Sequence, residues 1–427
     1  MRGPDDDLAR IARIFREESG RVVAHLIRRF GDISLAEEAV QDAFVRATER
    51  WPIDGVPPNP AGWITTTARN RALDVVRRER RRDDKYRTAT RTEPPMTDDP
   101  AEHDLTDDDL SGHARGGDTI TDDRLSLIFT CCHPALAAEA RIALTLRLLG
   151  GLTTTEIAKA FIVPEPTMAA RITRAKKKIE AARIPYRVPA ASELPDRLGG
   201  VLGVLYLVFN EGYFATSGSD LVRTELSGEA IRLTRVLVAL MPDEPEPLGL
   251  LALMLLTEAR RPARLDAAGR PVMLADQDRR RWDRASIAAG HDLVRRCIRR
   301  GQPGPYQLQA AIAAVHADAP THAATDWNQV VTLYDHLLTL APSDVVRLNR
   351  AIAVAARDGA AAGLALLDTL ALDAYGPFHV SRAELLRRAG QVAEAADEYA
   401  RALQLSDNAA ERTHLQGRLA SLQSLGR

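Results

Sequence analysis

A stretch of mixed aromatic and basic residues sets the first limits on how this 427-residue chain can fold. Residues 60–82, PAGWITTTARNRALDVVRRERRR, repeat apolar side chains every three or four positions, as one face of an α-helix does. Ile64, Ala68, Ala72 and Val75 form this apolar stripe. The pattern predicts one long helix that buries the stripe against a small helical domain.

A second stripe of the same helix carries groups suited to nucleic acid. It combines an aromatic ring with amide, carboxylate and guanidinium groups at helical spacing: Trp63, Thr67, Asn70, Asp74, Arg77 and Arg81. Seven arginines lie between Arg69 and Arg82, against only Asp74 and Glu79. A ring can stack on an unpaired base while arginines follow the phosphates. A packed tryptophan beside a solvated basic end is the alternative interpretation.

The composition favours an all-α protein of several domains. Ala, Leu and Arg dominate, and no run of alternating β-branched residues is long enough to predict a sheet. The three cysteines do not make a disulfide framework, which favours a reducing compartment. Neither a membrane-spanning apolar run nor a signal-type core is present, so we expect a soluble cytoplasmic protein.

The net charge of the chain is only −1, but an acidic region follows the basic stretch at residues 69–82. Residues 93–118 hold nine acidic residues and a single arginine, Arg115. Asp, Thr, Pro and Gly replace large apolar residues there, which predicts a flexible acidic linker over 84–122. A plain tether and a segment that competes with nucleic acid for the basic surfaces are the two interpretations.

The segment after the linker predicts a helix-turn-helix. LTTTEIAKAF forms a short helix that Thr153 and Glu156 cap reciprocally. After a short turn, TMAARITRAKKKIEAA buries Met168 and three further apolar residues and leaves its Arg and Lys side chains exposed. In a helix-turn-helix the second helix enters the major groove of DNA.

These motifs, in this order, resemble the extracytoplasmic-function (ECF) group of bacterial sigma-70-type sigma factors. DISLAEEAVQDAFVRATERW and PAGWITTTARNRALDVVRR are similar to conserved region 2, and GLTTTEIAKAFIVPEPTMAARITRAKKKI is similar to region 4. The resemblance covers residues 8–185. It implies a dissociable subunit that directs core RNA polymerase, through the β′ clamp helices and the β flap, to promoter DNA and opens the strands.

The resemblance also implies three sets of contact residues. The −10 element would meet Trp63, Thr67, Asn70, Arg71, Asp74, Arg77, Arg78 and Arg81. The −35 element would meet Thr167, Arg171, Arg174, Lys177 and Lys178. Core polymerase would meet Ala36, Glu37, Glu38, Val40, Gln41 and Asp42. Two positions depart from the family pattern: Pro166 stands where the family usually has glycine, and Ala169 replaces a position that is often basic or polar.

The last 242 residues, 186–427, exceed a minimal ECF factor and predict a helical extension. Gly390, Ala395, Tyr399 and Ala402 fall at the offsets that tetratricopeptide (TPR) units use for close helix packing. Such units stack into a concave surface that binds proteins or peptides, and we expect a ligand of that kind. The extension resembles the ECF subgroup in which a TPR-like domain takes the regulatory place of a separate anti-sigma factor.

No residue pattern in the chain indicates an enzyme. Cys131, Cys132 and His133 lack a second pair of metal ligands, and no Gly-rich phosphate loop or nucleophile–base pair stands in a supporting context. Glu211 in FNEGY and Arg279 in ADQDRRRWDR suit structural polar contacts better than chemistry. We therefore expect no catalytic residues, no metal and no cofactor.

The sequence thus predicts four parts in one all-α chain. They are a region 2 domain (1–83), the acidic linker (84–122), a region 4 helix-turn-helix domain (123–185) and a TPR-like regulatory extension (186–427). Two other functions stay open: a helix-turn-helix regulator and a TPR interaction scaffold, each acting without polymerase. A strand-opening helix at 60–82 argues against the regulator, and intact basic faces on both N-terminal modules argue against the scaffold.

Overall fold

The computed structural model describes residues 4–90, 117–161, 163–215, 217–218, 221–267 and 269–425. Its regular structure is helical, which confirms the all-α class; a two-residue parallel pairing of β1 (Ser217–Gly218) with β2 (Asp407–Asn408) is the exception within the described residues. The chain divides into two compact units, which we call unit 1 (1–159 and 163–204) and unit 2 (160–162 and 205–427). Among the described helices, none has the length and apolar character needed to cross a membrane.

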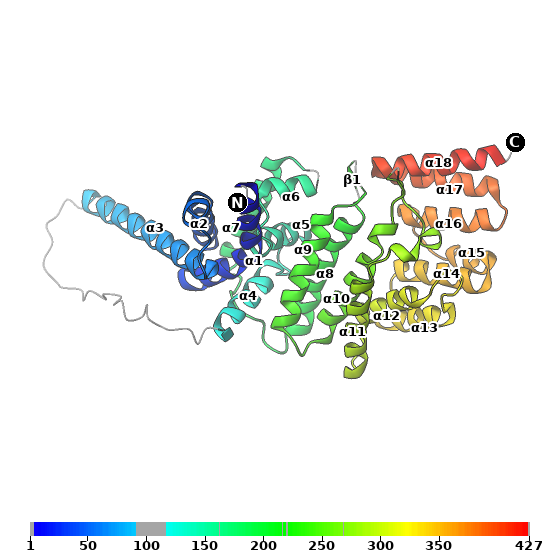
Figure 1. The fold of residues 1–427 in the computed structure, drawn as a ribbon, viewed down its shortest axis with the longest axis horizontal. Coiled ribbons are helices and arrows are strands. Elements are labelled where there is room, and N and C mark those ends of the chain that lie inside the picture. Colours follow the sequence, from blue (N-terminus) through cyan, green and yellow to red (C-terminus); the bar gives the residue numbers. More distant parts are fainter. Residues whose placement is uncertain are drawn as a thin grey trace. The chain divides into compact units, whose positions relative to one another are not determined.

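The described residues of unit 1 form seven α-helices, one π-helical segment and the first part of an eighth helix. Figure 1 labels most of these elements. They are α1 (Pro4–Phe30), α2 (Ile33–Asp54), α3 (Pro60–Thr90), α4 (Gly117–Cys131), α5 (Ala138–Leu144), η2 (Thr145–Leu149), α6 (Thr154–Ala160), α7 (Glu165–Ala181) and α8 (Leu194–Tyr213). Helices α1, α2 and α3 pack on one another, and α4 and η2 pack against α1.

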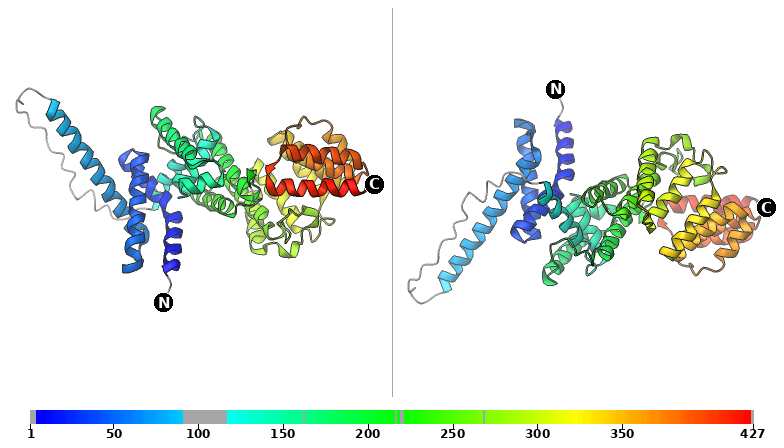
Figure 2. Two further views of the ribbon diagram at one scale, coloured as in Figure 1. Left: turned by 90° about the horizontal axis from the view of Figure 1, so that it is seen from above. Right: turned by 90° about the horizontal axis from the view of Figure 1, so that it is seen from below.

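The apolar stripe expected of residues 60–82 forms the buried side of α3. Ile64, Ala68 and Ala72 are fully buried, because α1 and α2 cover this face. Beyond them α3 continues as a single straight helix, visible in both views of Figure 2. Asp32 caps the N-terminus of α2, since its carboxylate accepts the free backbone N–H groups of Ser34 and Leu35.

The acidic linker is shorter at both ends than the sequence predicts. Helix α3 continues to Thr90 and α4 already begins at Gly117, although neither stretch shows a helical pattern of apolar residues. Polar residues such as Arg and Lys are compatible with an exposed helix, so low hydrophobicity alone does not end one. Residues 91–116, the central part of the predicted linker, lie outside the described residues.

The helix-turn-helix pattern is realised in α6 and α7. The hydroxyl and backbone N–H of Thr153 bond the Glu156 carboxylate, and Thr153 Oγ1 accepts from the Glu156 N–H at 3.1 Å, as the capping box predicts. Met168, Ile172, Ala175 and Ile179 are buried on one side of α7. The predicted core face of this helix is therefore correct.

Unit 2 holds the rest of α8 and a succession of helices that each pack on a neighbour in the chain. They are α9 (Thr224–Leu240), α10 (Pro245–Glu258), α11 (Arg284–Arg300), α12 (Pro305–Asp318), α13 (Trp327–Leu340), α14 (Asp344–Asp358), α15 (Ala360–Leu367), α16 (Gly376–Arg388), α17 (Val392–Leu405) and α18 (Ala409–Leu425). Three single 3₁₀ turns join α10 to α11: η3 (Arg261–Ala263), η4 (Leu274–Asp276) and η5 (Arg279–Arg281).

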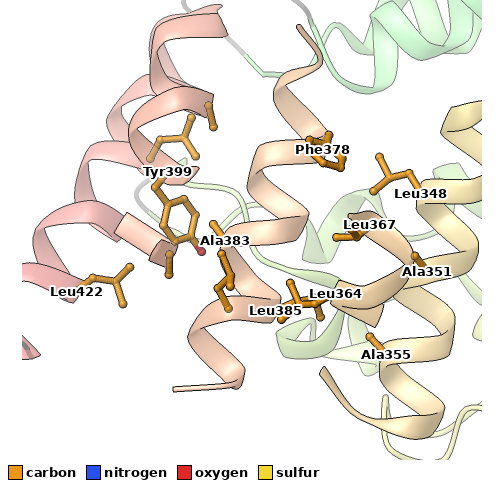
Figure 3. Packing of buried hydrophobic residues seen from close by; sticks show 14 residues of the cluster. Leu348, Ala351, Ala355, Leu364, Leu367, Phe378, Ala383, Leu385, Tyr399 and Leu422 are labelled. Carbon is orange, nitrogen blue, oxygen red and sulfur yellow. The ribbon is translucent and has the colours of Figure 1, made fainter. Parts of the chain in front are cut away.

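Three of the residues that suggested a repeat, Ala395, Tyr399 and Ala402, lie in the apolar core of α14 to α18. Tyr399 and Ala383 face each other across α16 and α17, and Phe378, Leu364 and Ala351 continue the core toward α14 (Figure 3). Gly390 has a φ of 80°, which suits the sharp turn between α16 and α17. This packing has the small-residue contacts expected of a TPR-like pair, and assignment to that repeat class stays a prediction.

The boundary between the two units falls inside a helix. The sequence places the end of the DNA-facing part at residue 185, in the proline-containing segment before α8. Unit 1 instead continues to Val204, nine residues before the end of α8 at Tyr213. Arg197 of α8 donates to the Phe129 carbonyl at 2.8 Å, which ties the start of this helix to α4 within unit 1.

Candidate nucleic-acid interface

The second stripe of α3 lies on the surface of the three-helix bundle. Asn70, Asp74 and Arg77 are exposed, while Trp63 and Thr67 are half-buried. The Trp63 ring lies edge to face with that of Trp51, with 5.4 Å between the ring centroids. Trp51 is buried near the end of α2, so it fixes the position of Trp63 and leaves part of that ring accessible.

The basic end of α3 is exposed, with one exception nearer the bundle. Arg77, Arg78 and Arg81 are exposed to solvent, and they form no ion pair among the described residues. Arg71 instead pairs with Asp42 of α2. This pair joins a residue expected at the −10 element to one expected at the polymerase, so Arg71 has a structural role as well.

Helix α7 presents its basic side chains away from its buried face. Thr167, Arg174, Lys177 and Lys178 are exposed, and Arg171 is half-buried. Four apolar residues hold the other face in unit 1, so the basic side chains project from a fixed support. The arrangement can donate hydrogen bonds to base edges and phosphates along one groove.

The residues expected to meet core polymerase divide into two groups on α2. Ala36 and Val40 are fully buried in the bundle, so their side chains are not on the surface as that role requires. Their spacing of four residues places them on the inward face of the helix. Glu38 is exposed, and Glu37, Gln41 and Asp42 are half-buried at the edge of the same helix.

Glu37 is engaged by two cations from the second half of unit 1. Arg147 Nε donates to Glu37 Oε1 at 2.5 Å, and the Lys176 ammonium pairs with Oε2. The Glu37 side chain is only 12% exposed, so the three groups are held in a largely dehydrated contact. Arg147 belongs to η2 and Lys176 to α7, so the contact ties α2 to the helix-turn-helix.

A second polar contact lies between α1 and α4. The Asp123 carboxylate is 3.1 Å from Arg28 Nη1 and 3.7 Å from His25 Nδ1. The Tyr186 hydroxyl lies 2.9 Å from the Ala24 carbonyl oxygen, and burial lowers the pKa of His25 despite the nearby carboxylate.

Helix α1 also approaches η2 closely. A Cβ built on Gly20 would lie 2.9 Å from the Leu149 carbonyl oxygen, which leaves no room for a side chain at that position. Together with the Glu37 and Asp123 contacts, this approach makes the two helical modules of unit 1 one packed body.

Comparison with protein families assigns both modules. The family described as sigma-70 region 2 matches residues 14–82, and sigma-70 region 4 matches residues 126–179. The chain is an ECF-like sigma factor with an additional C-terminal domain. A family of unknown function (DUF6596) matches residues 197–298 of that domain.

One similar protein covers almost the whole sigma factor. An uncharacterized protein of Rhizobium meliloti (strain 1021) is 44% identical over 400 residues, which span 93% of this chain and 92% of that protein. No solved structure matches the chain. The similarity includes the C-terminal part, so the joining of sigma regions to this extension is shared by both proteins.

The family matches follow the structural elements of unit 1. Region 2 covers most of α1, α2 and the described side chains of α3, and region 4 runs from Ser126 in α4 to Ile179 in α7. Sigma-70 regions of these kinds bind core RNA polymerase and promoter DNA, and sigma-factor families are not enzymes.

Sequence reasoning missed the partners of Glu37. Arg147 and Lys176 lie 110 and 139 residues away from Glu37 in the chain. Neither cation stands out locally, because both belong to basic or amphipathic helices with many similar residues. Only the packing of region 4 on region 2 identifies them.

The other polar motifs of the sequence have structural roles. Cys131 and Cys132 are buried, and burial raises the pKa of the Cys132 thiol to about 11. Glu211 of FNEGY pairs with Arg223 at 2.5 Å. No group of three or more His, Cys, Asp or Glu side chains that could hold a metal occurs among the described residues.

Proposed function

We propose that the sigma factor directs core polymerase in the cytoplasm to particular promoters and initiates transcription under control of its C-terminal extension. One observation carries the proposal: two basic faces, on α3 and α7, are exposed while the apolar sides of the same helices are buried. A surface suited to strand opening and a surface suited to reading duplex DNA would thus occur in one chain. A simple helix-turn-helix regulator needs only the second.

The division of work between the two faces follows from their chemistry. Trp63, with Thr67 and Asn70 beside it, would hold unpaired −10 bases, and the basic end of α3 would follow the phosphates. On α7, Thr167, Arg171 and Arg174 would meet −35 base edges, and Lys177 and Lys178 would meet phosphates. Guanidinium groups suit bidentate base contacts, whereas ammonium groups act as point charges.

Core polymerase would contact the exposed side of α2. Glu38, Gln41 and Asp42 reach this surface directly, and Glu37 reaches it only when Arg147 and Lys176 release the carboxylate. We infer that binding of polymerase competes with the packing of region 4 on region 2. The free factor would then be a closed form with low affinity for core polymerase.

The extension would control the factor by shifting the balance between this closed form and an open one. The Glu37 and Asp123 contacts that close unit 1 are made within unit 1 itself, so the extension need not cover the α2 surface to act. Its stacked helices suit a protein or peptide ligand. Binding of that ligand would change initiation through the extension.

The proposal is tested by run-off transcription with purified core polymerase and the full-length factor on a promoter library. The selected promoter then serves to compare Arg171→Ala with Lys177→Ala in DNA binding by the holoenzyme. We expect Arg171→Ala to lose about tenfold on the promoter and little on random DNA. Lys177→Ala should weaken binding to both DNAs alike. It should also reduce the slope of log affinity against log salt concentration by about 1.

The outcome separates the proposed function from its alternatives. If the factor supports no initiation from any promoter but binds duplex DNA alone, it is a regulator rather than a sigma factor. Equal losses on promoter and random DNA for both variants would refute the assignment of Arg171 to base contacts. Each variant is checked for native helix content by circular dichroism.

A further inference from the structure

Unit 2 contains a cluster of buried and half-buried polar side chains around the 3₁₀ turn η5. It consists of Arg279 and Trp282 from η5 and its end, His316 from α12, and His322 and Thr325 from the connection between α12 and α13. We call it the Arg279 cluster. None of these residues belongs to the sigma regions or to the DNA-facing surfaces.

Arg279 is the centre of the cluster and is only partly satisfied. Arg279 is only 7% exposed. Its Nη1 donates hydrogen bonds to the carbonyl oxygens of His316 and Ala319, at 2.5 and 2.6 Å. These bonds cap the C-terminal end of α12, where free carbonyls favour a cation. The guanidinium carbon lies 4.7 Å from the Trp282 ring centroid. Nη2 is buried and has no hydrogen-bond partner.

The two histidines are held by one tryptophan. Trp327, the first residue of α13, lies edge to face with both rings, at 5.3 Å from His316 and 5.0 Å from His322 between centroids. This arrangement fixes the ring planes without using their nitrogens. Nδ1 of each histidine is buried and unpartnered.

The cluster therefore gathers polar atoms that lack an acceptor. Besides Arg279 Nη2 and the two histidine Nδ1 atoms, the Trp282 indole N–H and the Thr325 hydroxyl are buried without a partner. Each buried polar group left unpaired costs about 1–3 kcal/mol, so several in one place call for an explanation. Arg, Trp and Thr all donate, and a histidine Nδ1 can donate as well. The missing partner is an acceptor.

The charged groups that act on His316 are positive. The pKa of His316 is lowered to about 3, first by burial and then by the positive charges of Arg260, Arg279 and His322. His322 also lies in the field of Arg388, with Asp276 as the opposing carboxylate at the exposed side. An anion placed among these groups would be attracted by the arginines and would favour protonation of the histidines.

We infer that the Arg279 cluster binds an oxyanion, the carboxylate or phosphoryl group of a ligand of the extension. A planar guanidinium with a free Nη2 offers a fork-type contact to such oxygens, and the indole and hydroxyl groups would complete their coordination. The ligand would enter beside half-buried His322, since residues 321, 323 and 324 of the same connection are exposed. This inference does not depend on the proposed sigma activity.

The experiment is anion titration of the full-length protein, followed by NMR of ¹³Cε1-labelled histidines. Sodium phosphate and sodium acetate are the two probes, and sodium chloride at matched ionic strength is the control. The His316→Asn and His322→Asn variants assign the two resonances. We expect one or both probes to shift these resonances saturably in the millimolar range, with no comparable shift in chloride.

Two adjacent arginines provide a matched pair of variants. Arg279→Gln should lower the affinity about tenfold, since a charge-assisted contact is lost. Arg280→Gln should change it less than about twofold, because Arg280 is 89% exposed and pairs with Asp278 at the surface. If Arg279→Gln does not fold for want of its α12 cap, Arg279→Lys and Thr325→Val replace it, each with an expected loss of affinity.

Comparing the phosphate and acetate titrations shows which kind of oxyanion the cluster binds. Saturation by phosphate alone identifies a phosphoryl group, saturation by acetate alone identifies a carboxylate such as a peptide side chain or C-terminus, and either supports the site. Shifts that equal those in chloride would overturn the inference. So would equal sensitivity of Arg279→Gln and Arg280→Gln, because the free Nη2 would then have no part in binding.

Discussion

Gly212 of FNEGY lies where the backbones of α8 and α9 approach each other closely. A Cβ at this position would lie 2.2 Å from the Ser227 backbone nitrogen on α9, closer than such atoms ever approach. We expect Gly212→Ala to lower the free energy of unfolding of unit 2 by about 3 kcal/mol, because neighbouring backbone cannot yield as a side chain does. Urea unfolding followed by circular dichroism measures the loss.

The control for this change is a glycine of α9 itself. A Cβ added to Gly228 would meet no atom within 4 Å, so Gly228→Ala should be neutral or stabilise by up to about 1 kcal/mol through helix propensity. If both variants unfolded at the same urea concentration, the close approach of α8 and α9 would not constrain Gly212.

His316 makes the stability of the α12–α13 region depend on pH. Its pKa is lowered from 6.5 to about 3, so the folded chain keeps the ring neutral. The stability is therefore present above pH 6.5 and falls as the pH drops from 6.5 toward 3, by up to about 1.4 kcal/mol per pH unit. Hydrogen exchange of the α12 and α13 amides at pH 7.0 and 5.5, in chloride buffer and corrected for intrinsic rates, should show the loss.

The comparison with His316→Asn separates this effect from other titrating groups. The variant should show a smaller difference in protection between the two pH values, since the depressed histidine is gone. An unchanged pH response in the variant would assign the effect to other residues, such as His322.

At the scale of secondary-structure elements, the contact of α2 with α7 controls which face of α2 is available. Lys176→Ala removes one of the two cations on Glu37 while Glu37 itself stays intact. A partly buried ion pair of this kind is worth about 1 kcal/mol, so opening should become about fivefold easier. We expect a corresponding gain in affinity for core polymerase without DNA, measured by fluorescence anisotropy.

Lys177→Ala is the matched control for this element-level change. Lys177 is the next residue of α7, is exposed and forms no ion pair among the described residues. Its replacement should leave the affinity for core polymerase unchanged in the absence of DNA. A loss of affinity in Lys176→Ala would mean that region 4 supports, rather than opposes, the binding of polymerase.

At the scale of the whole molecule, the position of the boundary inside α8 determines where the extension can be removed. A chain ended after Ala215 keeps all of α8, whereas one ended near residue 192 loses the Arg197 bond to Phe129 in unit 1. The Glu37 and Asp123 contacts remain in both. We expect the chain ended after Ala215 to initiate several-fold less than the full-length factor, because the closing contacts stay and the controlling part is gone.

Initiation by this shortened chain is compared with that of a second shortened chain that also carries Lys176→Ala. If the extension acts by opening unit 1, this double change should recover part of the lost run-off transcript. Initiation by the shortened chain at or above the full-length level would contradict an activating extension. Thermal unfolding of both shortened chains checks that they are folded.

The sequence alone determined the helical class, the two DNA-facing helices and their order. Helical periodicity and the Thr153–Glu156 cap depend on residues within one or two turns, so they can be recognised without the fold. The buried faces of α3 and α7 followed from the same local rule. The acidic segment was also recognised from its composition, although α3 and α4 extend into its two ends.

Only the tertiary structure decided which polar groups meet. Glu37 receives cations from 110 and 139 residues away, and Arg279 bonds carbonyls from 37 and 40 residues away. Ala36 and Val40, which the resemblance lists among the polymerase contacts, are buried in the bundle where α2 packs on α1 and α3. Such contacts depend on how helices pack across long chain separations, and no local spacing records that packing.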